Sequence, residues 1–582
     1  MKNKYEWDLS KIIKNERKFN ESITECEVLL NRACTFKNKI LKSSNSLFEF
    51  LRLNDEISRK VEKLYVYAYL NYYKDTTNNK AKALTLKVDK MLEDISLKLS
   101  FVSPEILNSD YKTIVEYIKE NKKLKEYKFS LENTFRYKKH ILTKDEEEII
   151  SAAANAMGSV HDAYSALNDA DVKFGYIKDE KGVKIELTHS NYSKYIKSNK
   201  RKVRKEAFIK MHEYYQKHIH TISNLYLGNI KESYFVSNIR KYNSPLEKSL
   251  FNDKIDPTLY DNLINSIHDN LKHLYKYYDI KKKMLKLNDI HLYDVYVNQK
   301  NMDKKNIKIE EGLNIIYEAL KPLGNEYIED LKKGINNGWI DAVVNKGKRS
   351  GAFSWGSYDT MPYLSVNYEN NFNSVDTLIH ELGHSMHSYY SNKKQNYVDA
   401  GYPIFLAEIA STVNQILLNK YMMSNAKTKE EKVKYICEFL ENVRTTVFRQ
   451  TMFAEFEKIV YEKYNEGISL TSEELCNTYY DLNKLYFGKN VVIDDYIKYE
   501  WARIPHFYTP FYVYKYATGF MIALVIVNKL LSEEDFNKKY IEFLSSGGSD
   551  YPLNILNKLG IELDVHTFNN AFLIFKEYLD ML

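Results

Sequence analysis

Helical periodicity over the first two hundred residues restricts the fold more than any other feature of this sequence. From Glu16 to about Asn199 apolar residues recur at spacings of three and four, as in SLFEFLRLNDEISRKVEKLYVYAYLNYYKD. This spacing is typical of amphipathic helices that bury one face. The chain also has only 19 Gly and 9 Pro, which is too few for a loop-rich β-sandwich of this size. We therefore expect a mainly α-helical protein.

The length of the chain predicts more than one lobe. Single hydrophobic cores rarely grow beyond about 250–300 residues, and this chain has 582. We place an approximate boundary near residue 200, between an N-terminal helical region at 1–200 and a second region at 201–582. Near this boundary, VKFGYI and VKIELTH flank a turn at 179–183 and are expected to pair as a hairpin.

The charge pattern argues against a nucleic-acid binder. The chain has 85 Lys plus Arg and 78 Asp plus Glu, a formal net charge of +7. Basic and acidic residues are interleaved, as in KENKKLKEYKFSLENTF, whereas nucleic-acid-binding proteins concentrate their basic residues on one face. We expect no nucleic-acid partner.

Cysteine usage and the distribution of apolar segments favour a cytoplasmic protein. The four cysteines form no CxxC pair and predict neither a disulfide framework nor a thiolate metal site: Cys26, Cys34, Cys437 and Cys476. The opening MKNKYEWDLSKII lacks the apolar stretch of a secretory signal. The most apolar segment, 520–527, is shorter than a bilayer span requires. We expect no contact with a membrane.

The helical pattern of apolar residues ends after Asn337. Residues 338–372 contain several glycines and aromatic residues and the alternating segment PYLSVNY, a pattern that predicts loop, short strand and loop. A helix is then expected to begin at Ser374, which can cap its N-terminus, with Asp376 in the first turn.

The predicted helix carries His380-Glu381-Leu382-Gly383-His384, an HExxH motif. Two histidines four residues apart project from one face of a helix, so their nitrogens can bind one Zn²⁺ at about 2.0–2.1 Å. The Glu lies further round the helix, beside the position of a metal-bound water, where its carboxylate can take a proton from that water. The motif therefore predicts metal-activated water with Glu381 as the general base.

The setting of the motif strengthens this interpretation. A chance HExxH in a chain with 14 His has a probability on the order of a few per cent. The alternative is two histidines and a glutamate on a solvated face. Apolar neighbours indicate instead that the helix is largely buried: Leu378, Ile379, Leu382 and Met386. An unliganded histidine pair in a core helix would be costly.

A catalytic zinc needs a third protein ligand and one open position. The class HExxHxxGxxH is excluded, because His387 occupies its Gly position and Tyr390 its final His position. His387 is better explained as a structural residue or a partner of a metal ligand. The other arrangement takes a Glu from a following helix, and FLAEIAST supplies Glu408. Since a lone buried carboxylate is costly, we predict that His380, His384 and Glu408 hold one Zn²⁺ per chain.

These residues resemble a known family. HELGHSMHSYY followed by IFLAEIAST is similar to the M3 metallopeptidases and, within them, to the oligoendopeptidase F group. The likeness extends to three further segments: WDLSKI, KRSGAFSWGSYDTMPYLSVNY and ARIPHFYTPFYVYKYATG. The order and spacing of these blocks, more than HExxH alone, carry the resemblance.

The resemblance implies a mainly α, multi-helix, two-lobed metallopeptidase with a deep central channel and a small β-sheet beside the HExxH helix. Region 1–200 would form one wall of the channel and region 201–582 the zinc peptidase. It implies a metalloendopeptidase that hydrolyses internal bonds of short oligopeptides. It also implies that PYLSVNY is the edge strand that pairs with the peptide. For the partner that orients the ligand histidines, Asp376 is a candidate.

The resemblance further implies that a histidine and a tyrosine stabilise the oxyanion. His506 is the histidine in this sequence. Among the tyrosines that follow or adjoin it, we rank Tyr514 first and Tyr512 second, with Tyr508 and Tyr516 behind. Because the chain has 50 Tyr, the same residues without the resemblance would be interpreted as core packing.

Three alternatives remain open from the sequence. The first is a helical zinc carboxypeptidase or dipeptidase, which trims ends instead of cutting within a chain. The second is a non-catalytic peptide-binding protein with a decayed site, although the complete ligand set and base argue against it. The third is the nucleic-acid binder, which has only the slight basic excess in its favour.

Overall fold

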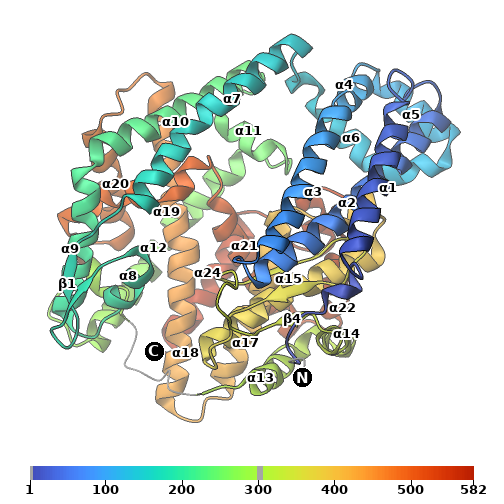
Figure 1. Ribbon diagram of the computed structural model, residues 1–582. Coiled ribbons are helices and arrows are strands. Elements are labelled where there is room, and N and C mark those ends of the chain that lie inside the picture. Colours follow the sequence, from blue (N-terminus) through green and yellow to red (C-terminus); the bar gives the residue numbers. More distant parts are fainter. Residues whose placement is uncertain (1–3, 298–305) are drawn as a thin grey trace. The chain divides into compact units, whose positions relative to one another are not determined.

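The computed structural model describes residues 4–297 and 306–582, which form two compact units (Figure 1). Unit 1 comprises the described residues of 1–139, 303–421 and 526–561, and unit 2 those of 140–302, 422–525 and 562–582. The mainly α-helical prediction is confirmed. No single position near residue 200 separates the units, because each is assembled from three segments of the chain.

Unit 1 contains the N-terminal helices and the helix with the HExxH motif. Its helices are α1 (Glu16–Cys34), α2 (Ser44–Lys74), α3 (Asn79–Lys98), α4 (Val102–Leu107), α5 (Tyr111–Glu120), α6 (Lys128–Arg136), α13 (Ile309–Ala319), α14 (Asn325–Asn336), α15 (Phe372–Lys394), α16 (Tyr397–Ala400), α22 (Phe536–Ser545) and α23 (Pro552–Lys558). Its strands are β4 (Ile340–Asp341), β5 (Phe353–Trp355) and β6 (Tyr363–Ser365). Helices α17 (Ile404–Ser424) and α21 (Tyr514–Ser532) each begin in one unit and end in the other.

Unit 2 is built from longer helices and two pairs of short strands. Its helices are α7 (Lys144–Ser165), α8 (His189–Ile196), α9 (Arg201–Lys217), α10 (Ile219–Ile239), α11 (Pro245–Phe251), α12 (Thr258–Met284), α18 (Lys429–Val443), α19 (Arg449–Asn465), α20 (Ser472–Phe487) and α24 (Val565–Asp580). Its strands are β1 (Tyr176–Lys178), β2 (Lys184–Glu186), β3 (Ile290–His291) and β7 (Val491–Val492). β1 and β2 pair antiparallel, which confirms the predicted hairpin.

Helix α2 illustrates how the periodic sequence produces the core of unit 1. Ser43 caps its N-terminus by accepting a hydrogen bond from the backbone N–H of Ser46. Its buried residues follow the predicted spacing of three and four, in a stripe that includes Phe50, Leu53, Ile57, Val61 and Leu64. This face packs into a core shared with α1, α3 and the N-terminal segment.

The three-stranded sheet of unit 1 has the order β4–β6–β5. Leu364 of β6 lies opposite Ile340 of the parallel strand β4 and opposite Ser354 of the antiparallel strand β5. The segment PYLSVNY contains β6, so the expectation that it forms the edge strand is wrong: it is the central strand, and β5 lies at an edge. Alternation in a sequence identifies a strand but does not identify the neighbours with which it pairs.

Helix α15 begins two residues earlier than predicted. Its N-cap is Asn371, whose side chain accepts a hydrogen bond from the Ser374 backbone N–H at 2.9 Å. Ser374 lies inside the first turn, and its hydroxyl accepts from the Glu369 N–H at 3.0 Å. Both residue types favour helix N-termini, and the earlier one forms the cap.

The apolar segment 520–527 belongs to a longer helix than the sequence indicated. Helix α21 has 19 residues, and it is the one helix among the described residues that is long and apolar enough to cross a membrane by length and composition. Its most apolar window is 61% buried inside the protein, as in the core helix of a folded domain. The expectation that the apolar stretch is too short to span a bilayer therefore does not hold for the helix as a whole.

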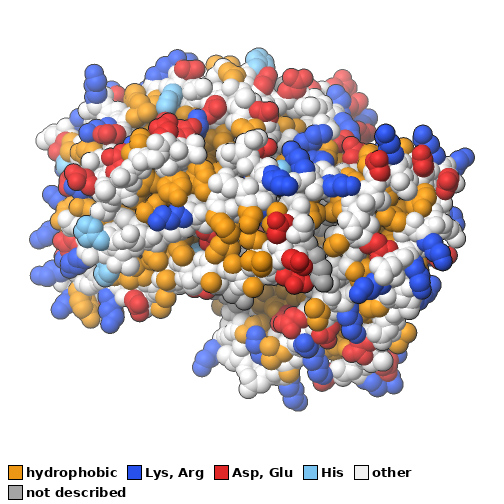
Figure 2. Space-filling view, turned by 90° about the horizontal axis from the view of Figure 1, so that it is seen from above, with side chains coloured by type: hydrophobic (Ala, Val, Ile, Leu, Met, Phe, Trp, Pro, Cys, Tyr) orange, Lys and Arg blue, Asp and Glu red, His pale blue; other side chains and the backbone are white. Residues whose placement is uncertain are grey.

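Charged side chains of both signs are distributed over the surface. Figure 2 shows Lys and Arg intermixed with Asp and Glu over the face that it presents, without a broad patch of one sign. This distribution agrees with the interleaved charges of the sequence.

Candidate active site

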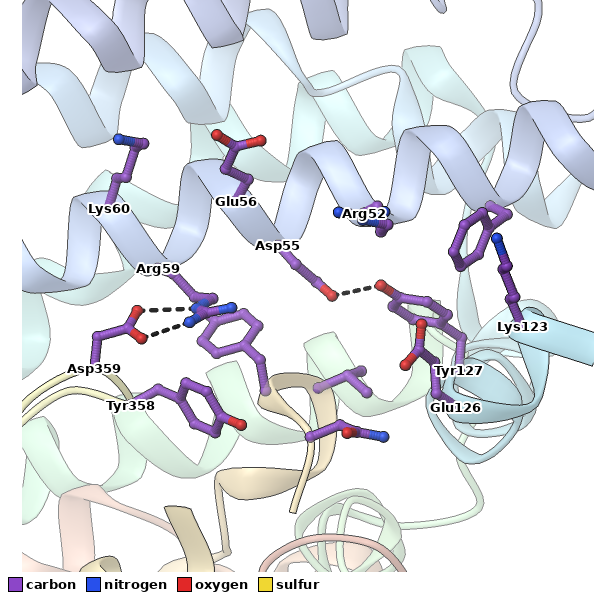
Figure 3. Close-up of a pocket in the computed structure, with 14 residues that line it drawn as sticks. Arg52, Asp55, Glu56, Arg59, Lys60, Lys123, Glu126, Tyr127, Tyr358 and Asp359 are labelled. Carbon is purple, nitrogen blue, oxygen red and sulfur yellow. Dashed lines mark hydrogen bonds and ion pairs between the residues drawn. The ribbon is translucent and has the colours of Figure 1, made fainter. Parts of the chain in front are cut away.

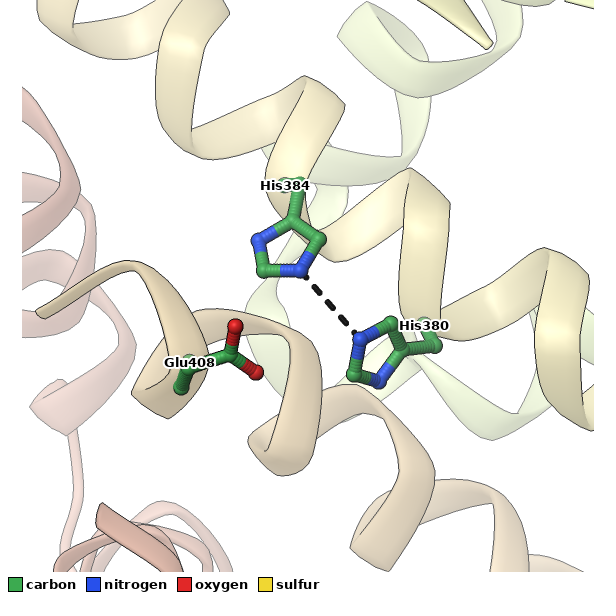
Figure 4. Close-up of side chains that lie close together, drawn as sticks. All are labelled: His380, His384 and Glu408. Carbon is green, nitrogen blue, oxygen red and sulfur yellow. Dashed lines mark hydrogen bonds between the residues drawn. The ribbon is translucent and has the colours of Figure 1, made fainter. Parts of the chain in front are cut away.

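The two motif histidines lie on the buried helix α15, and their rings meet edge to face with planes 84° apart (Figure 4). The Nε2 atoms of His380 and His384 are 3.2 Å apart. The apolar residues around them have no exposed surface, namely Val375, Leu378, Ile379, Leu382 and Met386. The helix is thus fixed in the core on one side while both imidazoles remain partly accessible on the other.

The structure brings the third predicted ligand, Glu408, to the same place. Glu408 lies on α17, and its carboxylate points toward the two rings (Figure 4). One ligand atom from each of His380, His384 and Glu408 lies within 4.8 Å of the other two. Two imidazoles and one carboxylate are a donor set that suits Zn²⁺ and leaves a coordination position open.

Gly383 sets the separation of the two helices that carry these ligands. A Cβ atom at this position would lie 2.6 Å from the Cα atom of Ser411 and 2.9 Å from the carbonyl oxygen of Ala410. The backbone of α15 at Gly383 therefore touches that of α17 at Ala410 and Ser411, just after Glu408. Only a residue without a side chain permits this approach.

Replacing Gly383 with Ala should disturb both the fold and the ligand group. Because the methyl group would meet backbone atoms, α17 must shift, and we expect a destabilisation of about 1–3 kcal/mol. Displacement of Glu408 should also lower the zinc affinity about tenfold, which is the usual effect of changing the orientation of a metal ligand. Urea unfolding and zinc titration measure these effects.

The matched control for this variant is Gly158→Ala. Gly158 also lies in a helix, α7, but nothing lies within 4 Å of the position that its Cβ would take. Since Ala favours helix over Gly, this variant should be as stable as the wild type or more so. Equal stability and zinc affinity for both variants would contradict the role assigned to Gly383.

His380 is oriented by a residue that the sequence did not reveal. Its Nδ1 atom lies 2.9 Å from Oε1 of Gln415, and Nε2 of Gln415 donates to Oδ2 of Asp376 at 2.8 Å. Asp376, the predicted partner, therefore reaches His380 only through Gln415. Gln415 stands seven residues after Glu408, on the same face of α17, and that spacing is the signal that could have identified it.

His384 is oriented by the backbone of α17. Its ring forms a hydrogen bond with the backbone of Ala407, the residue before Glu408. Burial lowers the pKa of His384 to about 3, so this imidazole is neutral over the physiological range. Each histidine therefore has its ring held by a hydrogen bond while its Nε2 atom points toward the other histidine. Histidines that bind metals are commonly oriented by such a hydrogen bond.

Glu381 is 8% exposed and is held by strand β5. The backbone N–H of Ser354 forms a hydrogen bond with its carboxylate, and the Ser354 hydroxyl lies 2.8 Å from that of Ser385 on α15. Burial raises the pKa of Glu381, and the nearby carboxylate of Glu408 raises it further. Strand β5 thus positions the predicted base beside the histidine pair.

His387 is fully buried and stacks on Tyr402, with ring centroids 3.7 Å apart and planes 9° from parallel. Neither of its ring nitrogens has a hydrogen-bond partner among the described residues. Burial lowers its pKa to about 3. These contacts agree with the structural interpretation of His387.

The predicted oxyanion donors lie in unit 2, whereas the ligand group lies in unit 1. His506 is in a 3-10 helix at Pro505–Tyr508, and its Nε2 atom is 3.5 Å from the hydroxyl of Tyr516. The ring of Tyr516 in turn contacts that of Tyr512 at 5.5 Å. Tyr514 is 1% exposed, and its hydroxyl has no hydrogen-bond partner within the described chain.

Family models match most of the chain. The model of peptidase family M3 matches residues 194–570, and the model described as oligopeptidase F matches residues 105–174. Among characterised relatives, oligopeptidase PepF of Bacillus subtilis is 37% identical over 99% of this chain and 86% of its own. The plasmid-encoded oligoendopeptidase F of Lactococcus lactis subsp. cremoris is 36% identical over 100% of this chain and 97% of its own.

Solved structures show the same fold. A putative peptidase from Chlamydophila abortus is 37% identical with a TM-score of 0.92, and the match covers 99% of this chain and 97% of that one. Oligoendopeptidase-F from Enterococcus faecium is 29% identical with a TM-score of 0.74, over 97% of this chain and 98% of that one. The likeness therefore extends over both units and is not limited to the HExxH region.

Proposed function

The chain belongs to peptidase family M3 and is a metalloendopeptidase of the oligoendopeptidase F group, and from this premise we propose that it is zinc-dependent and uses Glu381 as its general base. The observation that carries the proposal is the group formed by His380, His384 and Glu408 beside that glutamate. Its substrates are oligopeptides, which it cuts at internal bonds.

His380, His384 and Glu408 would hold the zinc ion. The fit is supported by the donor set, by the Nε2 atoms that face one another, and by the hydrogen bonds that orient each ring from behind. When bound, the ion supplies Lewis acidity, which lowers the pKa of water and polarises a carbonyl group.

Glu381 would accept the proton of the attacking water and deliver it to the leaving amine. A base acts best when its pKa approaches the working pH, and burial moves the pKa of Glu381 in that direction. The hydrogen bond from the Ser354 backbone holds the carboxylate in one orientation, so the base does not have to be ordered at the moment of reaction.

Strand β5 would bind the peptide backbone. It lies at an edge of the sheet, and one of its N–H groups contacts Glu381. A peptide that adds to this edge as a further strand would pass directly beside the base. The central strand β6 has neighbours on both sides and cannot take this role.

His506 would donate a hydrogen bond to the oxyanion, assisted by a tyrosine. A preorganised donor in a site without water stabilises such an oxyanion by about 3 kcal/mol. Tyr512 and Tyr516 are partly accessible, and Tyr516 contacts His506. Tyr514 has a buried hydroxyl, so we place it behind these two, although the sequence ranked it first.

An internally quenched peptide blocked at both ends tests endopeptidase action. We expect the zinc-loaded protein to cleave it, because no free terminus is needed. A carboxypeptidase or dipeptidase would leave the blocked peptide intact while trimming its unblocked form. A peptide-binding protein with a decayed site would cut neither form, with or without chelator.

A further inference from the structure

A cavity of about 860 Å³ lies within unit 1, beside the candidate active site. Its wall is formed by helix α2, by strand β5 with the turn that follows, and by the loop between α15 and α17. Two carboxylates, Asp55 and Glu62 of α2, line it. None of the described residues that line the cavity is Lys, Arg or His.

The cavity is continuous with the residues that hold the catalytic base. Ser354, whose backbone N–H contacts Glu381, is part of its wall. So is Ser388, one helical turn after His384, and its hydroxyl lies 2.7 Å from that of Tyr402. A peptide that lies along β5 would therefore present a neighbouring residue to this cavity.

The two carboxylates are held by tyrosines and not by cations. The Tyr127 hydroxyl donates to Asp55 at 2.6 Å, and the Tyr397 hydroxyl donates to Glu62 at 2.5 Å. Neither acid forms an ion pair with a basic side chain of the described residues 4–297 and 306–582. Burial raises the pKa of both carboxyl groups, and this effect outweighs the nearby charge of Arg59, as expected for partly buried acids that have no ion-pair partner.

Arg59 is the basic residue of α2 whose charge acts on both acids. Arg59 lies between the two acids in sequence, and its guanidinium binds both oxygens of Asp359, at 2.9 and 2.5 Å (Figure 3). Arg59 is therefore held by Asp359 and forms no ion pair with Asp55 or Glu62 among the described residues, although its charge still lowers the pKa of both acids.

Aromatic rings complete the cavity. Tyr65, Trp355, Tyr358, Tyr397 and Tyr402 all contribute to its wall. The rings of Tyr65 and Trp355 meet edge to face with centroids 5.5 Å apart. Aromatic faces attract ammonium and guanidinium groups, more strongly when water is excluded. Carboxylates and aromatic rings together thus favour a cation.

The adjoining cavity has a different character. It has a volume of about 700 Å³ and shares four residues with the first: Asp55, Tyr358, Tyr397 and Val398. Its lining carries both signs, including Arg52, Lys123 and Glu126 (Figure 3). Only the cavity next to the catalytic base, of these two, is lined by acidic residues without basic ones.

We propose that the cavity lined by Asp55 and Glu62, the acidic subsite, binds a cationic group of the oligopeptide substrate while a nearby bond is cut. The group is an ammonium or guanidinium, carried either by a Lys or Arg side chain or by the free N-terminus. Glu62 and Asp55 are then specificity-determining residues. This inference rests on the proposed endopeptidase function, which supplies the peptide.

The test compares peptides that differ in one charge. N-acetylated, internally quenched peptides of equal length carry Lys or norleucine at one position, which is scanned along the chain. We measure kcat/KM with the zinc-loaded protein, and Kd with the zinc-loaded Glu381→Gln protein, in which the peptide binds without being cut. At one position Lys should be preferred to norleucine about tenfold in both quantities.

Glu62→Gln should lower this preference about fivefold or more, because the amide keeps the shape and loses the charge. Asp55→Asn is the second variant, should the first fail to fold. The matched control is Glu56→Gln: Glu56 lies on the same helix and lines the adjoining cavity but not the acidic subsite, so this variant should keep the wild-type ratio.

The source of the cation follows from a third peptide, with norleucine and a free N-terminus. If only this peptide has a higher kcat/KM and tighter binding than the acetylated norleucine peptide, the subsite binds the terminal ammonium. If only the Lys peptide does, the subsite binds a side chain. A ratio near one at every position overturns the proposal, as does a ratio that Glu62→Gln leaves unchanged or that Glu56→Gln lowers equally. Selective binding without any cleavage would sustain the subsite and refute the endopeptidase function.

Discussion

Glu381→Gln should reduce kcat by about three to four orders of magnitude, the upper range for loss of a general base, while the protein keeps its zinc. The amide has nearly the same shape and can still accept the hydrogen bond from Ser354, so the surroundings of the histidine pair should not change. It cannot take a proton from water. Elemental analysis and steady-state kinetics on the same sample measure the two effects.

Glu369→Gln is the matched control for this variant. Glu369 is an exposed carboxylate just before α15, and its replacement should leave both zinc content and turnover at the wild-type level. Substantial turnover in zinc-loaded Glu381→Gln would remove Glu381 from the role of base. Loss of zinc from that variant would make it a ligand instead.

Glu408→Ala should lose zinc, because it removes one of three protein ligands. The loss of affinity should exceed the roughly 10–100-fold that follows from removing an outer partner. Burial raises the pKa of Glu408, so its carboxylate is costly to the metal-free fold, and its removal should not destabilise that fold. Zinc titration and thermal unfolding of the metal-free protein separate the two effects.

Gln415→Ala provides the comparison for the ligand variant. Gln415 contacts His380 and is not one of the three proposed ligands, so its loss should weaken zinc binding by no more than about 100-fold. Full zinc occupancy in Glu408→Ala would exclude Glu408 from the ligand set. Equal losses of zinc affinity in both variants would indicate that Glu408, like Gln415, supports a ligand and does not bind zinc itself.

The sequence predicted the local structure of the site well, because each local feature depends on a short pattern. The spacing of His380 and His384 predicted a helix, and the apolar residues before, between and after them predicted that this helix is buried. Glu408 stood out as an acid in an apolar helical segment. The structure brings these three side chains together.

Features that depend on how segments pair were less predictable. Gln415 of α17 reaches His380 of α15, and the backbones of these helices touch at Gly383. The spacing from Glu408 places Gln415 on the same face of α17, but no pattern within either helix encodes the contact between the two helices. The edge position of β5 follows from the order in which three short strands pair, and alternation in PYLSVNY does not reveal that order. Each unit is assembled from three segments that are far apart in the sequence, and no local pattern indicates which segments pack together.

The ranking of the tyrosines depends on tertiary contacts that the sequence does not reveal. Helix α21 begins at Tyr514, so Tyr512 lies before the helix and helical spacing does not relate it to Tyr516. The structure has Tyr512 in contact with Tyr516, and Tyr514 packed against Tyr260 at 5.6 Å. The order of the three tyrosines therefore follows from tertiary packing.

The most direct test of the account is the rate at which metal-free protein, titrated with Zn²⁺, cleaves a quenched peptide blocked at both ends. We expect no cleavage without metal and a rate that rises in proportion to added zinc until one equivalent per chain is bound. Full cleavage by the metal-free protein, or an intact peptide after one equivalent of zinc is bound, would contradict the central claim.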